Sequence, residues 1–154
     1  MTEASSHAAS YYAASANPAP ARDRLSGTIE TDVAIIGGGF TGVTAALSLA
    51  ERGRSVALIE ANRIGWGASG RNGGQVLAGW SGEGEFAKQL GPRGEEFLWR
   101  TRYIGHDIIA RRIERYQIQC DYARGTATVA LTPKQMAGFE KEYETLQRTG
   151  SRIH

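Results

Sequence analysis

The chain has 154 residues, the length of one ordinary globular domain with a core of its own. Its 18 basic and 16 acidic residues give a formal net charge of +2, which excludes the strong field needed to hold nucleic acid or an anionic membrane surface. Small molecules are therefore the favoured partners.

Cysteine and histidine usage limits the chemistry further. The single cysteine, Cys120, excludes an internal disulfide, and the three histidines are too widely spaced for a metal-ligand pattern. We therefore expect no metal site and a reducing, cytoplasmic location. Cys120 lies between Ile118 and Tyr122, so we expect it on a half-buried strand in a structural role and not as a reactive thiol.

Residues 1–27 are rich in Ala and Ser, contain Pro18 and Pro20, and show no helical or strand periodicity. We predict a mostly irregular N-terminal arm, residues 1–27, followed by a folded domain over residues 28–154. Two adjacent aromatics, Tyr11 and Tyr12, would be unusual in a solvated tail. At least one of them is expected to dock on the domain.

The next segment alternates between strand and helix patterns. Residues 33–36 form a short apolar run that ends in three glycines, as a strand buried on both faces does. A helical stripe from Val43 to Ala50 follows, and Gly53 suits the end of a helix. Residues 56–59 form a second apolar run. This order predicts an α/β fold built on a Rossmann-like βαβ unit with parallel strands.

Residues 33–50 carry no charge and are long enough for a transmembrane helix to be considered. Four glycines interrupt the segment, and its flanks, Asp32 and Glu51, are acidic where a membrane-anchored helix prefers Lys, Arg or aromatic residues. We therefore expect no integral membrane segment.

A GxGxxG motif, formed by Gly37, Gly39 and Gly42, follows the first strand directly. The first glycine permits a tight turn, the second lets the backbone approach a pyrophosphate, and the third allows close packing of helix on strand. The helix that begins near Phe40 would point its unpaired N–H groups at the phosphates. Glu60, at the end of the second strand, can accept hydrogen bonds from the ribose hydroxyls of an adenosine.

A GxGxxG motif alone is a weak signal, but this one continues with the other positions of the βαβ fingerprint, which are Ala46, Leu49, Gly53, Val56 and Glu60. The context favours dinucleotide binding over a merely structural βαβ unit. A 2′-phosphate would meet the carboxylate of Glu60, which argues against NADP. The fingerprint does not separate FAD from NAD.

A glycine-dense stretch extends to about Gly84, and a helix is predicted over residues 95–116, with its arginines on the solvated face. Residues 121–131 are β-rich. Thr132, Pro133 and Gln135 then have the pattern of an N-cap, a first-turn proline and a capping box, so a last helix should begin there and end near Gly150.

Residues 65–75 read GWGASGRNGGQ, and with this segment the chain resembles the D-amino-acid oxidase and glycine oxidase superfamily of FAD-dependent oxidoreductases. The resemblance is strongest to its gamma-glutamylputrescine oxidoreductase-like branch. It runs from the tyrosine pair of the arm, through IIGGGFTG and Glu60, to residues 121–133. It therefore covers essentially the whole chain and implies the N-terminal portion of a FAD-binding domain of this type.

The resemblance implies a set of cofactor-binding residues. The first glycines would pack on the FAD pyrophosphate, Glu60 would bind the ribose, Arg63 would lie by the adenine or ribose, and residues 68–75 would run beneath the pyrophosphate toward the flavin ring. The full set is Gly37, Gly39, Phe40, Thr41, Gly42, Glu60, Ala61, Arg63, Ala68, Ser69, Gly70, Arg71, Asn72, Gly73, Gly74 and Gln75.

Two details of this site follow from the residues present. Arg71 could neutralise a phosphate or form a structural ion pair, and the sequence favours neither. No histidine lies between Glu60 and Gly105, so the histidyl flavin link that some relatives form in this region is absent. FAD is therefore expected to bind noncovalently.

The resemblance also implies an activity. The protein would oxidise a C–N bond in an amine or amino acid related to gamma-glutamylputrescine, with hydride passing to flavin and oxygen reoxidising it. One rival is a dehydrogenase that delivers electrons to another acceptor, and another is a noncatalytic nucleotide-binding module. No catalytic residue can be named. A two-stranded unit cannot cover strands this apolar, so we expect the chain to be part of a longer protein.

Overall fold

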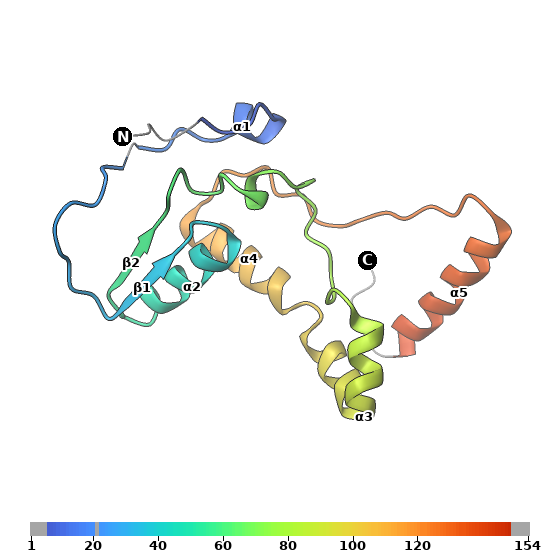
Figure 1. Cartoon of the computed structure of the whole chain (residues 1–154). Helices are drawn as coiled ribbons and strands as arrows, with labels where there is room; N and C mark the ends of the chain where they lie inside the picture. The colour runs from blue at the N-terminus through green and yellow to red at the C-terminus, as the bar shows by residue number, and fades with distance from the viewer. Residues whose placement is uncertain (1–5, 21, 149–154) are drawn as a thin grey trace. The chain divides into compact units, whose positions relative to one another are not determined.

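The computed structural model describes residues 6–20 and 22–148 of the chain, which divides into two compact units, residues 1–111 and residues 112–154. Figure 1 shows the secondary structure in chain order. The elements are α1 (Tyr11–Ser15), β1 (Val33–Ile36), α2 (Phe40–Ala50), β2 (Val56–Ile59), the 3₁₀ turn η1 (Ala68–Gly70), α3 (Glu83–Thr101), α4 (Ile104–Tyr116) and α5 (Pro133–Arg148). Among the described residues, no helix is both long and apolar enough to cross a membrane.

The first unit is built on a parallel βαβ arrangement, as predicted (Figure 1). β1 and β2 pair in parallel from Val33 opposite Val56 to Ile36 opposite Ile59. The start of this pair is fixed by Asp32 and Ser55, because the Asp32 N–H donates to the Ser55 hydroxyl at 2.8 Å and the Ser55 N–H donates to the Asp32 carboxylate at 2.9 Å. The strand ends that lead into the two loops are therefore aligned.

The C-terminus of α2 confirms the role expected of Gly53. This residue has φ +76°, a left-handed conformation that glycine adopts without steric cost. Its N–H donates to the Ala50 carbonyl at 2.9 Å, and the next N–H, from Arg54, reaches back to the Leu49 carbonyl at 3.1 Å. These bonds satisfy the last carbonyls of the helix and turn the chain into β2.

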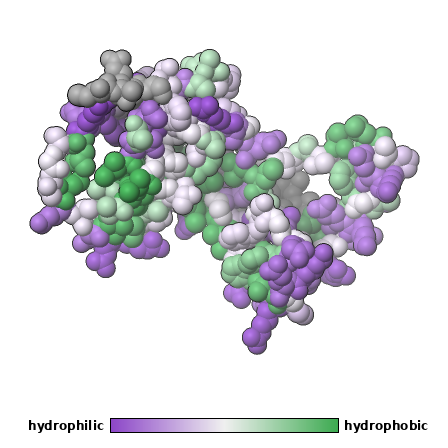
Figure 2. Space-filling view, in the orientation of Figure 1, coloured by the Kyte–Doolittle hydropathy of each residue, from purple (hydrophilic) through white to green (hydrophobic). Residues whose placement is uncertain are grey.

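The strands are less covered than their apolar sequence predicts. α2 packs against both strands, yet Ile36 is 90% exposed and Ile59 is 41% exposed. Among the described residues, Leu98 of α3 is the one apolar side chain that is nearly fully buried, at 4% exposure. Figure 2 accordingly shows green apolar patches at the surface between purple polar ones. The expectation of strands buried on both faces is wrong for the described residues, because one helix covers only one face of a sheet.

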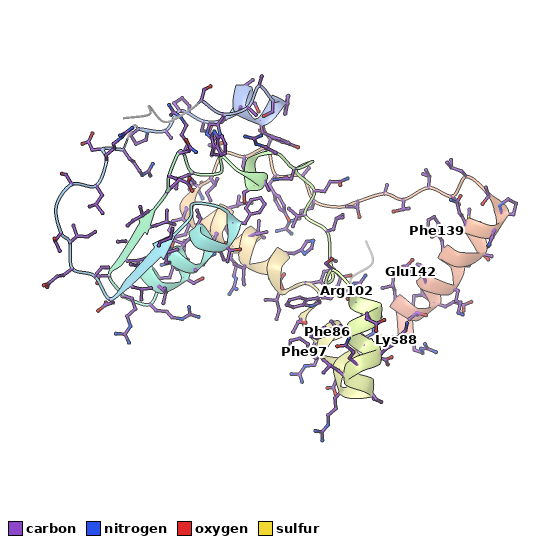
Figure 3. All side chains as sticks on the ribbon, viewed as in Figure 1. Phe86, Lys88, Phe97, Arg102, Phe139 and Glu142 are labelled. Carbon is purple, nitrogen blue, oxygen red and sulfur yellow. The ribbon has the colours of Figure 1, made fainter. Side chains whose placement is uncertain are left out.

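The helix predicted over residues 95–116 is instead two helices, α3 and α4, and α3 starts earlier, at Glu83. α3 itself is kinked at Gly91, which has φ +62° and precedes Pro92, a residue that disfavours helical conformation before it. α3 ends at Thr101, and Figure 3 labels the next residue, Arg102, at this end of the helix. Arg102 forms an ion pair at 3.1 Å with Glu83. The break at 102–103 thus coincides with a contact to the start of α3.

Aromatic packing stabilises the same end of α3. The indole N–H of Trp80 donates to the Thr101 hydroxyl at 3.0 Å, and its ring lies 6.2 Å from the ring of Phe97. Arg102 also stacks on Trp99, with 5.1 Å between the guanidinium carbon and the ring centre. This cluster joins the loop before α3 to the C-terminal end of the helix.

In the second unit the start of α5 agrees with the sequence. The Thr132 hydroxyl accepts from the Gln135 N–H at 3.3 Å, as an N-cap does, while the Gln135 side chain accepts from the Leu131 N–H at 2.9 Å. In an ordinary capping box the Gln135 side chain would accept from the N–H of Thr132, the N-cap residue. Here it accepts from the residue before the N-cap. α5 ends at Arg148, and the expected end near Gly150 lies outside the described residues.

Residues 121–131 form no strand, so the β-rich prediction is wrong there. Cys120 is exposed, and the half-buried strand expected around it is absent. Asp121 has φ +50° and Gln117 has φ +51°, which interrupt extended structure on either side of the cysteine. β-propensity alone does not make a strand when no neighbouring strand accepts its hydrogen bonds.

Candidate cofactor-binding site

The first glycine turn, residues 37–42, links β1 to α2. Gly37 has φ +105°, and its N–H donates to the Ile59 carbonyl at 2.8 Å, so the turn is joined to the end of β2. A Cβ at Gly42 would fall on the Gly37 carbonyl oxygen. The backbone itself therefore requires glycine at both positions, and α2 can begin directly against the turn.

The N-terminus of α2 receives a side-chain cap from a distant residue. Gly39 is the N-cap and has no side chain to offer, but the Ser69 hydroxyl accepts from the Phe40 N–H at 2.9 Å. Within the described part of the chain, the N–H groups of Thr41 and Gly42 donate to no protein acceptor. These two donors at the positive end of the helix dipole fit an anionic ligand.

Glu60 follows β2 and turns back toward the first glycine turn. One carboxylate oxygen accepts from the Gly38 N–H at 2.7 Å, and the other accepts from the Asn62 N–H at 2.9 Å. These backbone hydrogen bonds hold the pKa of the Glu60 carboxyl below its ordinary value of 4.5. A carboxylate has about four acceptor positions, so it keeps capacity for ribose hydroxyls.

Replacing Glu60 with glutamine is expected to flatten the acid side of the stability profile. Because the pKa of Glu60 is lowered on folding, its contribution is present above the ordinary value of 4.5 and is lost as pH falls through the lower folded value. The glutamine amide can satisfy only one of the two N–H donors. Melting temperatures measured from pH 7 to about pH 3 should therefore differ most at neutral pH and converge in acid. A constant difference would contradict this role.

The second glycine loop, residues 65–75, is joined to the first turn by the Gly65 N–H, which donates to the Gly38 carbonyl at 2.8 Å. A Cβ at Gly70 would fall on the Gly65 carbonyl oxygen, so η1 folds tightly onto the start of the loop. Inside the loop, Asn72 donates to the Ser69 carbonyl at 2.7 Å and accepts from the Gly74 N–H at 2.8 Å. The loop is thus a folded turn and not an open chain.

This folding reduces the number of donors that the loop can offer a cofactor. The N–H groups of Gly70 and Arg71 donate to the carbonyls of Gly67 and Ala68, and that of Gly74 donates to the Asn72 side chain. The expectation that several loop N–H groups face an anionic ligand is therefore wrong for these three. A loop this rich in glycine satisfies its own polar backbone where it can.

The side chain of Arg71 contacts Trp66 within the same loop. Arg71 stacks on the ring of Trp66, 4.8 Å from the ring centre, and its Nε donates to the Trp66 carbonyl at 3.2 Å. None of the ion pairs among the described residues involves Arg71, so they provide no support for the ion-pair alternative. Four other residues of the predicted cofactor-binding set are exposed, namely Ala61, Arg63, Gly73 and Gln75.

Sequence reasoning missed the side-chain role of Ser69. It assigned this residue to a backbone loop, whereas the structure uses its hydroxyl to cap α2 at 2.9 Å. The signal was present, because a helix whose N-cap is Gly39 must find an external acceptor for its first N–H. The Asn62 contact to Glu60 was also missed.

The parallel βαβ unit, with its glycine turn and a carboxylate at the end of β2, defines a Rossmann-like domain of the nucleotide-binding class. A family model described as FAD dependent oxidoreductase matches residues 32–153. The chain therefore belongs to this family of FAD-dependent enzymes, which confirms the resemblance inferred from the glycine loops.

Curated relatives agree with the family match. The chain is 45% identical over 99% of its length to gamma-glutamylputrescine oxidoreductase of Escherichia coli (strain K12), of which it covers 35%. It is 44% identical over 94% of its length to a "Probable oxidoreductase OrdL" of Haemophilus influenzae, of which it covers 34%. The chain thus spans about a third of the length of these relatives. No solved structure matches it.

Proposed function

We propose that this chain supplies the ADP- and pyrophosphate-binding part of a FAD-dependent oxidoreductase that oxidises a C–N bond in an amine or amino acid. The observation that carries the proposal is the convergence of three features at one edge of the βαβ unit. These are the unpaired N–H groups at the start of α2, the carboxylate of Glu60, and the second glycine loop held against both. Membership of the FAD dependent oxidoreductase family supports FAD over NAD.

The residues present fit the ADP half of FAD. Thr41 and Gly42 would donate to the pyrophosphate, with Gly37, Gly39 and Phe40 forming the turn beneath it. Glu60 would accept from the ribose hydroxyls through its remaining lone pairs, with Ala61 and Arg63 beside the adenosine. Residues 68–75, which are Ala68, Ser69, Gly70, Arg71, Asn72, Gly73, Gly74 and Gln75, would line the path toward the flavin ring. FAD supplies the redox chemistry, and these residues bind and orient it.

The proposal extends to the substrate and the electron acceptor. The E. coli relative carries the name gamma-glutamylputrescine oxidoreductase, which supports an amine of that kind as substrate. Oxygen is the proposed acceptor, and the alternative is a dehydrogenase with another carrier. Peroxide formation during amine turnover by the FAD-loaded full-length protein of which this chain is proposed to be part would favour the oxidase, and turnover without peroxide would favour the alternative. The proposed FAD is noncovalent and the proposed location is cytoplasmic.

We also propose that residues 28–154 are part of a larger FAD-binding domain preceded by the arm. The support is physical: a sheet that leaves Ile36 90% exposed has apolar surface that further strands or helices would cover. The isolated chain would then hold the ADP end of FAD without enclosing its flavin ring. We therefore expect it to bind FAD weakly and to turn over no substrate.

A competition experiment tests the assigned end of the cofactor. Titration of the purified chain with FAD, followed by the change in flavin fluorescence, should show weak binding that ADP displaces, because ADP carries the groups that the first glycine turn and Glu60 would contact. FMN should fail to compete, since it lacks the adenosine and second phosphate. NADP should compete less well than NAD because its 2′-phosphate would meet Glu60. Displacement by FMN as effective as that by ADP would overturn the assignment.

A further inference from the structure

We infer that Tyr12 in the N-terminal arm is a positioning residue that holds the second glycine loop in the shape needed for FAD. The inference rests on the proposed function for its ligand and on contacts between the arm and the loop for its mechanism. It gives the arm, residues 1–27, a role that neither the family match nor the names of the relatives assign.

The arm presents Tyr12 through a short helix. Ser10, one residue before the tyrosine pair, caps α1 by accepting from the Ala13 N–H at 3.2 Å, which fixes the start of the helix at Tyr11. Tyr12 is 43% exposed, whereas Tyr11 beside it is 76% exposed. The two tyrosines therefore differ in how they meet the rest of the unit, although they are adjacent in the sequence.

Tyr12 lies on Gly74 of the second glycine loop. Its hydroxyl occupies the place where a Cβ of Gly74 would project, with the ring carbon Cζ 2.9 Å from that position. Gly74 also has φ +71°, a conformation that side chains rarely adopt. This close approach meets the expectation that at least one tyrosine of the arm docks, and only a glycine can receive it.

A second contact joins the arm to the other end of the loop. The indole N–H of Trp66 donates to the Ser6 carbonyl at 3.1 Å. Trp66 in turn supports Arg71, whose guanidinium stacks on its ring and whose Nε donates to its carbonyl. The arm therefore contacts the loop at both Trp66 and Gly74, on either side of η1.

The contacts continue from Gly74 to the start of α2. The Gly74 N–H donates to the Asn72 side chain, which donates to the Ser69 carbonyl, and the Ser69 hydroxyl accepts from the Phe40 N–H. A continuous path thus leads from Tyr12 to the proposed phosphate site. Glycine-rich segments have much conformational freedom to lose on ordering, so fixing this loop beforehand lowers the entropic cost of binding a ligand on it.

The test compares Tyr12→Ala with its matched control, Tyr11→Ala. FAD titration should show at least about fivefold weaker binding for Tyr12→Ala and little change for Tyr11→Ala. Limited trypsin cleavage after Arg71 reports the loop without any ligand, and cleavage after Lys88 on α3 reports general unfolding. We expect Tyr12→Ala to accelerate cleavage at Arg71 alone, and Tyr12→Phe, which keeps the ring on Gly74, to restore most of the protection.

Three other outcomes decide against the inference. Equal FAD affinity and equal Arg71 cleavage in the two alanine variants would overturn it. Faster cleavage at both Arg71 and Lys88 would show general destabilisation, and faster Arg71 cleavage with unchanged FAD affinity would show that the loop shape does not matter for FAD. Absence of FAD binding by the unmodified chain would overturn the proposed function, and Arg71 cleavage alone would then decide whether the arm holds the loop.

Discussion

Replacing Gly42 with alanine is expected to destabilise the first unit by about 2 kcal/mol. Alanine is the better helix former by up to about 1 kcal/mol, which on its own would favour the change. The added Cβ would fall on the Gly37 carbonyl oxygen, and overpacking of this kind costs about 1 to 3 kcal/mol or more. The upper end of that range applies, because the contacted atom belongs to the backbone and cannot move aside easily. The Gly37 N–H also donates a hydrogen bond to the Ile59 carbonyl at 2.8 Å, which holds this turn in place. The clash therefore outweighs the gain in helix propensity.

Urea unfolding followed by circular dichroism measures the change, and Gly84→Ala is the matched control. Gly84 lies in the first turn of α3, as Gly42 lies in the first turn of α2, but a Cβ there would meet nothing within 4 Å. Gly84→Ala should be neutral or slightly stabilising. Equal stability of the two variants would mean that the close packing of α2 on the turn carries no cost, which would contradict the steric role of Gly42.

The parts of the fold that the sequence predicted well are those set by local signals. Three such features depend on residues within a few positions of each other. They are the apolar runs that became β1 and β2, the glycine turn between β1 and α2, and the turn at Gly53 that follows α2. The start of α5 is of the same kind, because the side chains of Thr132 and Gln135 satisfy backbone groups that lie three and four residues away. Local patterns of this type decide structure before tertiary packing does.

The parts that failed depend on distant partners. Residues 121–131 have strand-like composition but no neighbouring strand among the described residues, and Cys120 is exposed as a result. The predicted helix over 95–116 breaks where Arg102 pairs with Glu83, nineteen positions earlier. The spacing of apolar residues within the helix carries no information about such a contact. The kink at Gly91 and Pro92 was a local signal and could have been found.

The candidate site divides in the same way. Motif spacing predicted that Gly37, Gly42 and Glu60 would gather at one edge, and the contacts bring them together. It could not predict that the Ser69 hydroxyl would cap α2 across 29 positions, nor that Tyr12 would lie on Gly74. Spacing describes one segment, whereas these contacts depend on how two loops and the arm fold over each other.

Replacing Gly39 with valine is expected to weaken FAD binding at least about 100-fold while the chain stays folded. Gly39 has φ −85° and ψ −174°, an extended conformation that any residue adopts, so its backbone does not demand glycine. A Cβ there would lie 3.0 Å from the Ser69 hydroxyl, the end of a side chain that can give way. Loss of stability should therefore be limited to about 1 kcal/mol, the usual effect of a poor N-cap residue. Under the proposed assignment, the valine would obstruct the pyrophosphate.

Fluorescence titration with FAD and urea unfolding together separate the effect of Gly39→Val from that of Gly42→Ala. Gly39→Val should mainly lower the affinity for FAD, whereas Gly42→Ala should mainly lower the stability of the fold. Gly39→Ala and the double variant Gly39→Ala/Ser69→Ala then identify the cause. If the methyl group acts by displacing Ser69 from α2, both should bind FAD equally poorly, because Ser69→Ala also removes the cap. If it obstructs the phosphates directly, the double variant should bind more weakly than Gly39→Ala, because it loses the cap in addition. Unchanged FAD affinity in Gly39→Val would show that the pyrophosphate does not approach the chain at this glycine.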